Sequence, residues 1–496
     1  MSSTRRYLSI LSSCGVFLVA ALALVYQGPA MIRDADPFWH IAAGDWIRAH
    51  HQLPQNDPWS FSAGVYRWFN ISWAWDTLFS YIHEQWGWYG AEAATALTVG
   101  LAIALTYSAG IMVCGDGIAA FFAIFAGLPI LLPSLRPLEI TNLMAALWML
   151  LLIAVTAKKL HPAWLVALPV SMIVWVNSHG GFFIGFIMLV AFTVEALRTR
   201  DRQLVAALVA AGLMSFVAIF INPYGVGILE AVYRPLTTTA NHILSEWQPF
   251  SFSPDSLLTH FYLPLFALLV FRYPLPVNPA VRWLSYVWLG IGLLTVRSLG
   301  VFVIISAPLL ACRLKELLKP KRPPTAFAIM IRQHATTWLA NPFAAGLGLA
   351  LCIAFSVWLP SAAANRLLGI DQASIPSLAK EEDFIKTHYP HAHILIHFDL
   401  GGMVEYDTQG TIRTFMDGRT ETAFPAQVMQ DYIDFEYAMP GWERMLDHYH
   451  IDGVLIPKGT PPFVMARPDL YDRFAQRSGW KKAFDGPMAV LFMRGQ

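Results

Sequence analysis

A carboxylate and an imidazole stand at helical spacing in the segment DADPFWHIAAGDW (34–46). Pro37 suits the first turn of a helix, so Asp36 is the expected N-cap, with its carboxylate at the positive end of the helix dipole. His40 follows four residues later, over the same face of that helix. Carboxylates and imidazoles commonly transfer protons, so this segment is a candidate for acid–base chemistry, with Asp34 as a second acid. The alternative is an ordinary helix cap in which Asp34 is a solvated loop charge.

Two further segments place polar residues at the ends of apolar runs. In RPLE, the Arg136 guanidinium suits phosphate, and Glu139 offers a carboxylate for a metal ion or a substrate hydroxyl. A mutual ion pair between these two residues is the alternative. In WVNSHGGFFIG, Asn177 and His179 are expected in a tight turn, where Gly180 permits close backbone approach. A capped helical hairpin without a ligand is the alternative there.

Other polar positions are more isolated. Arg297, in TVRSLG between two apolar runs, is either an interface anchor or a ligand for a lipid phosphate. Asn222, in INPYG, ends another apolar run and joins the candidate set. Near the C-terminus, FDLGG (398–402) and DGRTE (417–421) are expected to be loops after strands, and turn chemistry is their simplest explanation.

The composition places the chain among membrane proteins. Apolar residues make up 56% of the 496 residues and charged residues 14%, against about 25% charged residues in a typical soluble domain. The net charge of +1 provides no excess of cations for a polyanion, which excludes a nucleic-acid partner. The four cysteines have no zinc or thioredoxin spacing and are interpreted as packing residues. We therefore predict a polytopic α-helical membrane protein.

Apolar runs of about 20 residues predict membrane-spanning helices. About 11 segments qualify, at 8–26, 91–112, 117–133, 138–157, 162–178, 180–197, 203–221, 258–272, 281–296, 298–312 and 343–360. Lys and Arg are concentrated on one side of these helices, as at Lys158, Lys159 and the basic run 313–342, which assigns the N-terminus and this run to the cytoplasm. An odd number of spans then places the chain after residue 360 outside.

The same pattern divides the chain into two parts. Residues 1–360 are predicted to form a transmembrane module with large outer loops at 27–88 and 222–257 and a cytoplasmic linker at 313–342. Residues 361–496 have a soluble composition and are predicted to form an extracytoplasmic α/β domain. Its expected strands are 393–398, 411–416, 453–457 and 487–493, and its expected helices are 426–438, 441–450 and 468–478.

On this topology the candidate polar residues lie at the outer ends of helices. Ionisable groups at membrane depth are costly, so they are functional candidates by default. Their clustering on one side indicates a site at the outer membrane surface. A transporter would instead place polar groups near mid-depth, on interrupted helices.

Taken together, the motifs resemble those of the GT-C superfamily of membrane glycosyltransferases, which use polyprenyl-phosphate-linked sugars as donors. DPFWH (36–40) is similar to the acidic first-loop motif of the oligosaccharyltransferase catalytic subunit. The ordered set DADPFWHIAAGDWI, LPQNDPWSF, RPLE, WVNSHGGFFIG, INPYG, DLGG and DGR resembles a bacterial branch of the superfamily and covers nearly the whole chain.

By this resemblance, Asp36 corresponds to the catalytic aspartate of the first outer loop, and Asp34 is its neighbour. Glu139 takes the place of the second-loop acidic motif, which often has two acids, whereas here Arg136 accompanies a single acid. A divalent metal, Mg²⁺ or Mn²⁺ held by Asp36 and Glu139, is therefore left open. The tail has no WWD-type acceptor motif, which argues against glycosylation of proteins at asparagine.

The resemblance implies an enzyme that moves a hexose or pentose from a polyprenyl phosphate to a hydroxyl of a glycan, lipid or protein acceptor. The site would face outward from a bacterial inner membrane. Asp36 is the expected general base, and Arg136, Arg297 and His179 are expected to hold the departing phosphate. The other predicted substrate-binding residues are His40, Glu139, Asn177 and Asn222. Two other classes stay open: a transporter or flippase for lipid-linked sugars, and a non-catalytic scaffold whose tail binds envelope partners.

Overall fold

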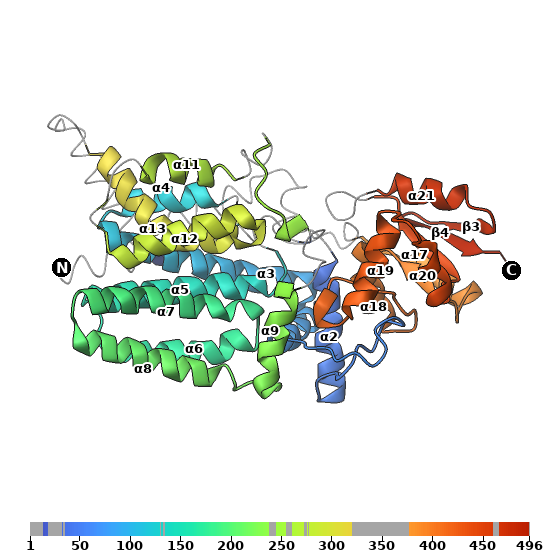
Figure 1. Cartoon of the computed structure of the whole chain (residues 1–496), viewed down its shortest axis with the longest axis horizontal. Coiled ribbons are helices and arrows are strands. Elements are labelled where there is room, and N and C mark those ends of the chain that lie inside the picture. Colours follow the sequence, from blue (N-terminus) through green and yellow to red (C-terminus); the bar gives the residue numbers. More distant parts are fainter. Residues whose placement is uncertain are drawn as a thin grey trace.

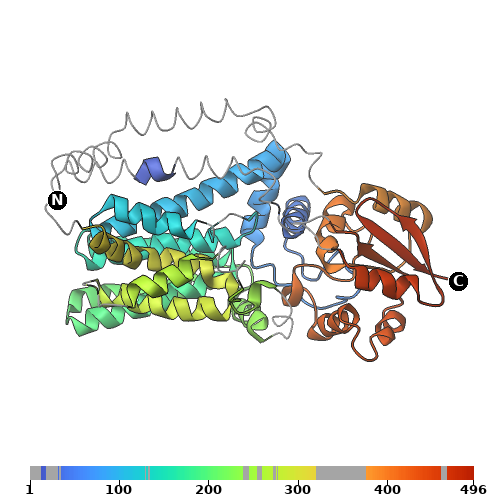
Figure 2. The same ribbon diagram turned by 90° about the horizontal axis from the view of Figure 1, so that it is seen from above.

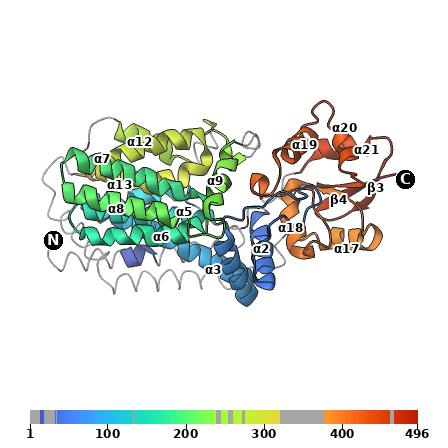
Figure 3. The same cartoon turned by 60° about the horizontal axis from the view of Figure 1, so that its bottom comes forward.

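The computed structural model describes residues 13–17, 32, 35–128, 130–131, 134–237, 245–253, 260–271, 275, 277–319, 376–459 and 466–495. A helical bundle occupies one end of the molecule, and a smaller unit with a β-sheet occupies the other (Figure 1). The helices α2 (Asp36–His50) and α9 (Ile228–Thr237) lie across the bundle direction, between the two parts (Figures 1 and 3).

The described helices of the bundle coincide with nine of the predicted apolar segments. They are α3 (Trp73–Cys114), α4 (Gly117–Gly127), α5 (Leu138–Thr156), α6 (Ala167–Val176), α7 (Phe183–Arg198), α8 (Arg202–Ala218), α11 (Tyr262–Val270), α12 (Pro279–Leu294) and α13 (Leu299–Leu317). Within the described ranges, four stretches are long and apolar enough to cross a membrane by length and composition, namely Trp73–Cys114, Leu138–Thr156, Gly180–Arg198 and Val296–Leu317. The predicted spans 8–26, apart from residues 13–17, and 343–360 lie outside the described residues.

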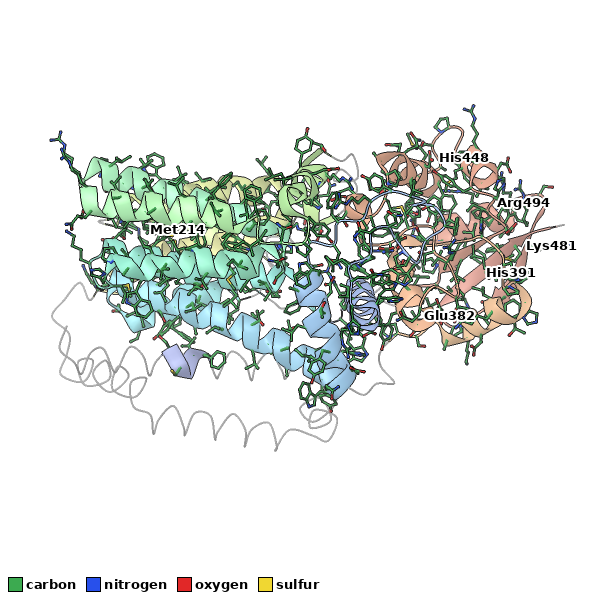
Figure 4. The ribbon with its side chains drawn as sticks, turned by 90° about the horizontal axis from the view of Figure 1, so that it is seen from below. Met214, Glu382, His391, His448, Lys481 and Arg494 are labelled. Carbon is green, nitrogen blue, oxygen red and sulfur yellow. The ribbon has the colours of Figure 1, made fainter. Side chains whose placement is uncertain are left out.

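The bundle is apolar both inside and outside, as expected for helices that contact lipid. Inside, the buried Trp148 and Trp175 rings pack edge to face with centroids 5.7 Å apart. Outside, α8 exposes large apolar side chains that include Leu213 and Val217, and Met214 lies on the surface of the bundle (Figure 4). The chain therefore has the helical architecture of a membrane protein.

The first predicted outer loop is more helical than the sequence indicated. Pro37 stands in the first turn of α2, and α3 already begins at Trp73, well before the predicted start at 91. Gly87 has a positive φ of 60° and kinks α3, so the first part of this helix leaves the bundle direction. At Gly44 a side chain would clash with the Asp76 backbone, which shows how closely α2 approaches α3.

The C-terminal unit contains a four-stranded sheet in the order β1-β2-β4-β3. Strands β1 (Ile394–Ile396) and β2 (Gly453–Pro457) are parallel, whereas β4 (Ala489–Arg494) is antiparallel to β2 and to β3 (Trp480–Asp485). The helices are α17 (Ala379–His388), α18 (Phe398–Thr408), α19 (Ala426–Glu436), α20 (Glu443–His448) and α21 (Pro468–Ala475). Strands and helices thus form an α/β arrangement.

Two local predictions in this unit are wrong. The expected strand 411–416 is a loop, and its Thr414 forms only an isolated bridge with Ser60. The segment FDLGG is not a loop, because it forms the first turns of α18. The strands near 393–398, 453–457 and 487–493 and the three predicted helices are present.

The first outer loop and the C-terminal unit are in direct contact. Thr414 donates its backbone N–H to the Trp59 carbonyl oxygen at 3.1 Å, and its own carbonyl oxygen accepts from Phe61 at 3.0 Å. At Gly402, on α18, a side chain would meet the backbone of Ala35 at the start of α2. Figure 2 shows α2, the short blue helix, between the bundle and the orange-to-red C-terminal unit. This junction holds the candidate site.

Candidate active site

A cavity of about 540 Å³ opens where α2, the ends of the bundle helices and the C-terminal unit meet. Five of the residues singled out in the sequence line it: Asp36, His40, Arg136, His179 and Arg297. They come from four separate stretches of the chain, so the fold brings together groups that are far apart in sequence. The walls are otherwise a mixture of aromatic, acidic and backbone groups.

The predicted helix is present, but Asp36 is its first residue and not its N-cap, which is Ala35. The Asp36 carboxylate makes no capping hydrogen bond because Arg136 and Trp39 bind it instead. Its Oδ2 pairs with Nη2 of Arg136 at 3.0 Å, and its Oδ1 accepts a hydrogen bond from the Trp39 indole at 3.1 Å. The Asp36 side chain is 21% exposed, so it remains accessible from the cavity. The carboxylate is therefore oriented by its partners and open to a substrate.

A row of alternating charges extends from Asp36 across the wall of the cavity. Arg136 also donates from Nη1 to Oε2 of Glu246 at 3.0 Å, and Arg297 pairs with Oε1 of the same carboxylate. Burial opposes ionisation of Glu246, but Arg297 and Arg136 together hold the pKa of Glu246 below its usual value. Two arginines thus converge on one carboxylate, which marks a position suited to an anion.

The two predicted histidines have different environments. His40 is buried and its Nδ1 lies 2.6 Å from Oδ1 of Asp76, whose other oxygen accepts from Ser72. This hydrogen-bonded pair joins α2 to α3. Asp76 had no recognisable motif in the sequence.

His179 is neutral at physiological pH. Burial, followed by the nearby Arg297 and His40, lowers the pKa of His179 to about 3. Its Nδ1 accepts from the Gly181 backbone N–H at 3.1 Å and lies 2.8 Å from the Thr141 hydroxyl. Nε2 is then the protonated nitrogen of the ring. His179 can donate a hydrogen bond to a ligand but brings no positive charge.

Three other predicted site residues do not line the cavity. Glu139 accepts from the Ser134 backbone N–H at 3.1 Å and from the Asn142 amide at 2.9 Å. Asn177 accepts from the Trp73 indole and donates to backbone carbonyls, whereas Asn222 closes its own turn. These side chains stabilise helix ends rather than a ligand. Asp34 lies outside the described residues.

The predicted metal pair does not fit this arrangement. Asp36 faces an arginine and an indole N–H, which are not metal ligands, and both Glu139 oxygens accept hydrogen bonds from protein donors. Among the described residues, no group of three or more His, Cys, Asp or Glu side chains is placed to hold a metal ion.

The DGR segment, which the sequence analysis explained as an ordinary turn, lines the cavity with Gly418 and Arg419. A Cβ at Gly418 would overlap with Oδ1 of Asp36 and approach the Trp39 indole to 3.1 Å. The backbone of the C-terminal unit at Gly418 therefore lies directly against the Asp36 side chain. Only a residue without a side chain allows this approach.

Arg419 holds this segment in place. Its guanidinium is buried and pairs with Asp57 at 2.6 Å, Glu405 at 2.9 Å and Asp417. The Trp59 and Trp68 rings lie on the guanidinium, with centroids 4.8 and 4.7 Å away. Because Asp57 and both tryptophans belong to the first outer loop, Arg419 joins that loop to the C-terminal unit.

We expect Gly418→Ala to destabilise the junction between α2 and the C-terminal unit, because the added methyl group displaces Asp36 or the DGR segment. Overpacking of this kind costs about 1–3 kcal/mol. Thermal unfolding of the purified protein checks this expectation. Gly290→Ala is the matched control, since no atom lies within 4 Å of its added Cβ. Equal unfolding temperatures for the two variants would contradict the close contact between Gly418 and Asp36.

Comparison with solved structures identifies the class of fold. A scan against known families found no match, and a search of curated proteins found none either. The structure of ArnT from Cupriavidus metallidurans bound to undecaprenyl phosphate matches with a TM-score of 0.50 and 15% identity, over 96% of this chain and 97% of ArnT. The archaeal oligosaccharyltransferase AglB from Archaeoglobus fulgidus matches with a TM-score of 0.49 and 13% identity, over 96% of this chain and 74% of AglB.

The chain therefore has the fold of the GT-C membrane glycosyltransferases. Within this fold it resembles ArnT over essentially the full length of both chains. The motif resemblance noted in the sequence is confirmed at the level of fold. A shared fold does not establish an activity or the roles of residues, which depend on the chemistry of the site.

Proposed function

We propose that the protein is a GT-C glycosyltransferase that transfers a sugar from a polyprenyl phosphate to an acceptor hydroxyl. The charge row in the cavity carries this proposal. An accessible carboxylate, Asp36, lies beside Arg136, and Arg136 and Arg297 converge on one anionic position. Such a transfer needs a base for the acceptor proton and, beside it, a site that binds the departing phosphate.

The reaction follows from these groups. Asp36 takes the proton of the acceptor hydroxyl while the acceptor oxygen bonds to the anomeric carbon of the donor. The bond between that carbon and the phosphate oxygen breaks through an oxocarbenium-like transition state. Arg136 and Arg297 bind the departing lipid phosphate, and neutral His179 donates a hydrogen bond. Since a phosphate is a good leaving group, no separate acid is required.

The proposed placement in the cell follows the charge pattern of the sequence. The site faces outward from a bacterial inner membrane, with the N-terminus cytoplasmic and the C-terminal unit extracytoplasmic. Residues 1–360 form the membrane module and residues 361–496 the outer domain in this proposal. The donor is a polyprenyl-phosphate-linked hexose or pentose. A groove between the bundle helices takes the isoprenoid chain.

Two alternatives are less well supported by the site. A flippase would place its charged groups on interrupted helices at mid-depth, whereas Asp36, Arg136 and Arg297 gather at one end of the bundle. A scaffold would leave no cavity beside Asp36, but a cavity of about 540 Å³ lies there. The transferase is therefore the preferred function.

Binding of undecaprenyl phosphate to Glu246→Gln tests this assignment. In the wild type, Glu246 occupies the anionic position between the two arginines, so a lipid phosphate has to displace it. Removing its charge should tighten binding about tenfold, which corresponds to one charge-assisted hydrogen bond. The measurement is a titration of the detergent-purified protein with undecaprenyl phosphate.

Glu230→Gln is the matched control for this titration. Glu230 lies on α9, is largely exposed, and pairs with Arg234 at 2.7 Å, away from the cavity. This variant should bind the lipid phosphate as the wild type does. Weaker or unchanged binding by Glu246→Gln would contradict the assignment of Arg136 and Arg297 to the phosphate.

A further inference from the structure

The wall of the cavity that belongs to the C-terminal unit is acidic. Asp399, Glu421 and Glu436 all line it. Helix α19 contributes one face, because Met429, Tyr432, Ile433 and Glu436 follow helical spacing and all line the cavity. The same cavity is also lined by the bundle residues Arg136 and Arg297.

Glu421 is the most unusual residue of this wall. It is only 7% exposed, and its Oε2 has no hydrogen-bond partner among the residues that the structure describes. Buried polar atoms are normally paired, and an unpaired carboxylate oxygen is costly. Burial raises the pKa of Glu421, with Arg297 opposing and Glu246 adding to the effect, so Glu421 lies within electrostatic reach of the charge row.

Glu436, at the end of α19, is a second glutamate of this wall with one unpaired oxygen among the described residues. Its side chain is 12% exposed, and its Oε1 lies 3.3 Å from Nε2 of His397 and also pairs with Arg467. Its Oε2 is buried and, within the described part of the chain, has no partner. The cavity is thus bordered by two glutamates from one unit, each with one oxygen that has no hydrogen-bond donor among the described residues.

The cations near this wall are already paired. Arg419 has three carboxylate partners, and Arg467 pairs with Glu436 and with Asp469. An anionic ligand would therefore meet acids here and gain no unpaired cation among the described lining residues. A ligand that supplies O–H or N–H donors would give these two glutamates the partners that the described residues do not provide.

We propose that this wall is the acceptor subsite and that it takes a sugar that presents hydroxyl or amino groups and carries no phosphate or carboxylate at that position. The proposal rests on the transferase function above and adds the chemical class of the acceptor. The two walls then divide the substrates by charge, with the donor phosphate on the arginines of the bundle and the uncharged or cationic acceptor on the C-terminal unit. Tyr437, which also lines the cavity and is exposed, supplies aromatic surface for the sugar.

The test is the sugar preference of the full-length purified protein on an array of neutral, aminated, uronic and phosphorylated oligosaccharides. We expect the wild type to bind neutral and aminated members and to reject the acidic ones. In the double variant Glu421→Gln, Glu436→Gln, the preference for neutral and aminated over phosphorylated members should fall at least about tenfold, because acceptors are lost and repulsion is relieved. A merely structural role of the two glutamates would not change this ratio.

Asp434→Asn is the matched control, since it removes a charge from the same helix α19 outside the cavity lining. It should keep the wild-type preference. An unchanged preference in the double variant, or a wild type that favours phosphorylated sugars, overturns the acceptor subsite. Undecaprenyl phosphate is titrated in the same samples. A wild type that does not bind this lipid overturns the transferase proposal instead, and the double variant should bind it within about twofold of the wild type.

Discussion

Asp36→Asn is expected to lower glycosyl transfer by about 100- to 10,000-fold, the usual contribution of a general base. The asparagine has almost the same shape, and its one oxygen can accept a hydrogen bond from either Trp39 or Arg136, which in the wild type bind the two different oxygens of Asp36. It cannot take up the acceptor proton. The variant should therefore fold, bind undecaprenyl phosphate and fail in the chemical step. Single-turnover transfer rates, measured beside lipid binding, separate these effects.

Asp45→Asn is the matched control for this experiment. Asp45 lies on the same helix α2, but it faces Arg48 and does not line the cavity that contains Asp36. Its replacement should leave the transfer rate close to that of the wild type. Near-native turnover by Asp36→Asn would remove Asp36 from the role of base. Loss of lipid binding in this variant would instead indicate that Asp36 mainly positions Arg136.

Arg419→Met is expected to produce the largest loss of stability, about 3–5 kcal/mol, because it leaves buried carboxylates without their cation. Asp57, Glu405 and Asp417 all depend on this guanidinium, which has no exposed surface. The loss should appear as a lower unfolding temperature in detergent. It should also loosen the first outer loop from the C-terminal unit.

This loss should depend on pH in a defined direction. Burial already raises the pKa of Glu405 well above its usual value, with Arg419 opposing, and Arg419 acts against burial to keep the pKa of Asp417 low. Without Arg419 the folded state holds protons that the unfolded state releases, so its stability rises as the pH falls. The deficit relative to the wild type should therefore be smaller at about pH 5 than at about pH 8.

Arg413→Met is the control for this substitution. Arg413 is exposed on the same loop, so its removal should cost little. An equal loss of stability in the two variants, or a deficit in Arg419→Met that does not change with pH, would contradict the buried charge cluster. The comparison thus tests the junction on which the geometry of Asp36 depends.

The parts of the fold that depend on local pattern were predictable from the sequence. Apolar runs located the bundle helices, and the Asp-Pro pair located the start of α2 and hence Asp36. The strand at 480–485 was missed because WKKAFD is rich in charge, which an edge strand tolerates. The false strand at 411–416, TIRTFM, is rich in β-branched and aromatic residues, which favour strands. In the structure its Thr414 instead forms an isolated bridge and backbone hydrogen bonds with the first outer loop.

The site itself was only partly predictable, because its key contacts join distant segments. Arg136 and Arg297 were candidates from their positions, but nothing local indicated that Glu246 would join them. The DGR segment was noticed, yet the contact of Gly418 with Asp36 spans almost the whole chain. From the sequence alone, a glycine between Asp417 and Arg419 indicates only a turn, because the Asp36 side chain that it contacts is remote in the chain.

The most direct test of the central claim is the reaction of the purified protein with a panel of polyprenyl-phosphate sugars. The assay detects free polyprenyl phosphate and the transferred sugar in the same samples. We expect at least one donor to release its lipid phosphate in an acceptor-dependent manner, with sugar appearing on the acceptor. If no donor is cleaved, while reconstituted vesicles move the intact lipid-linked sugar across the bilayer, the protein is a transporter and the proposed transfer reaction is wrong.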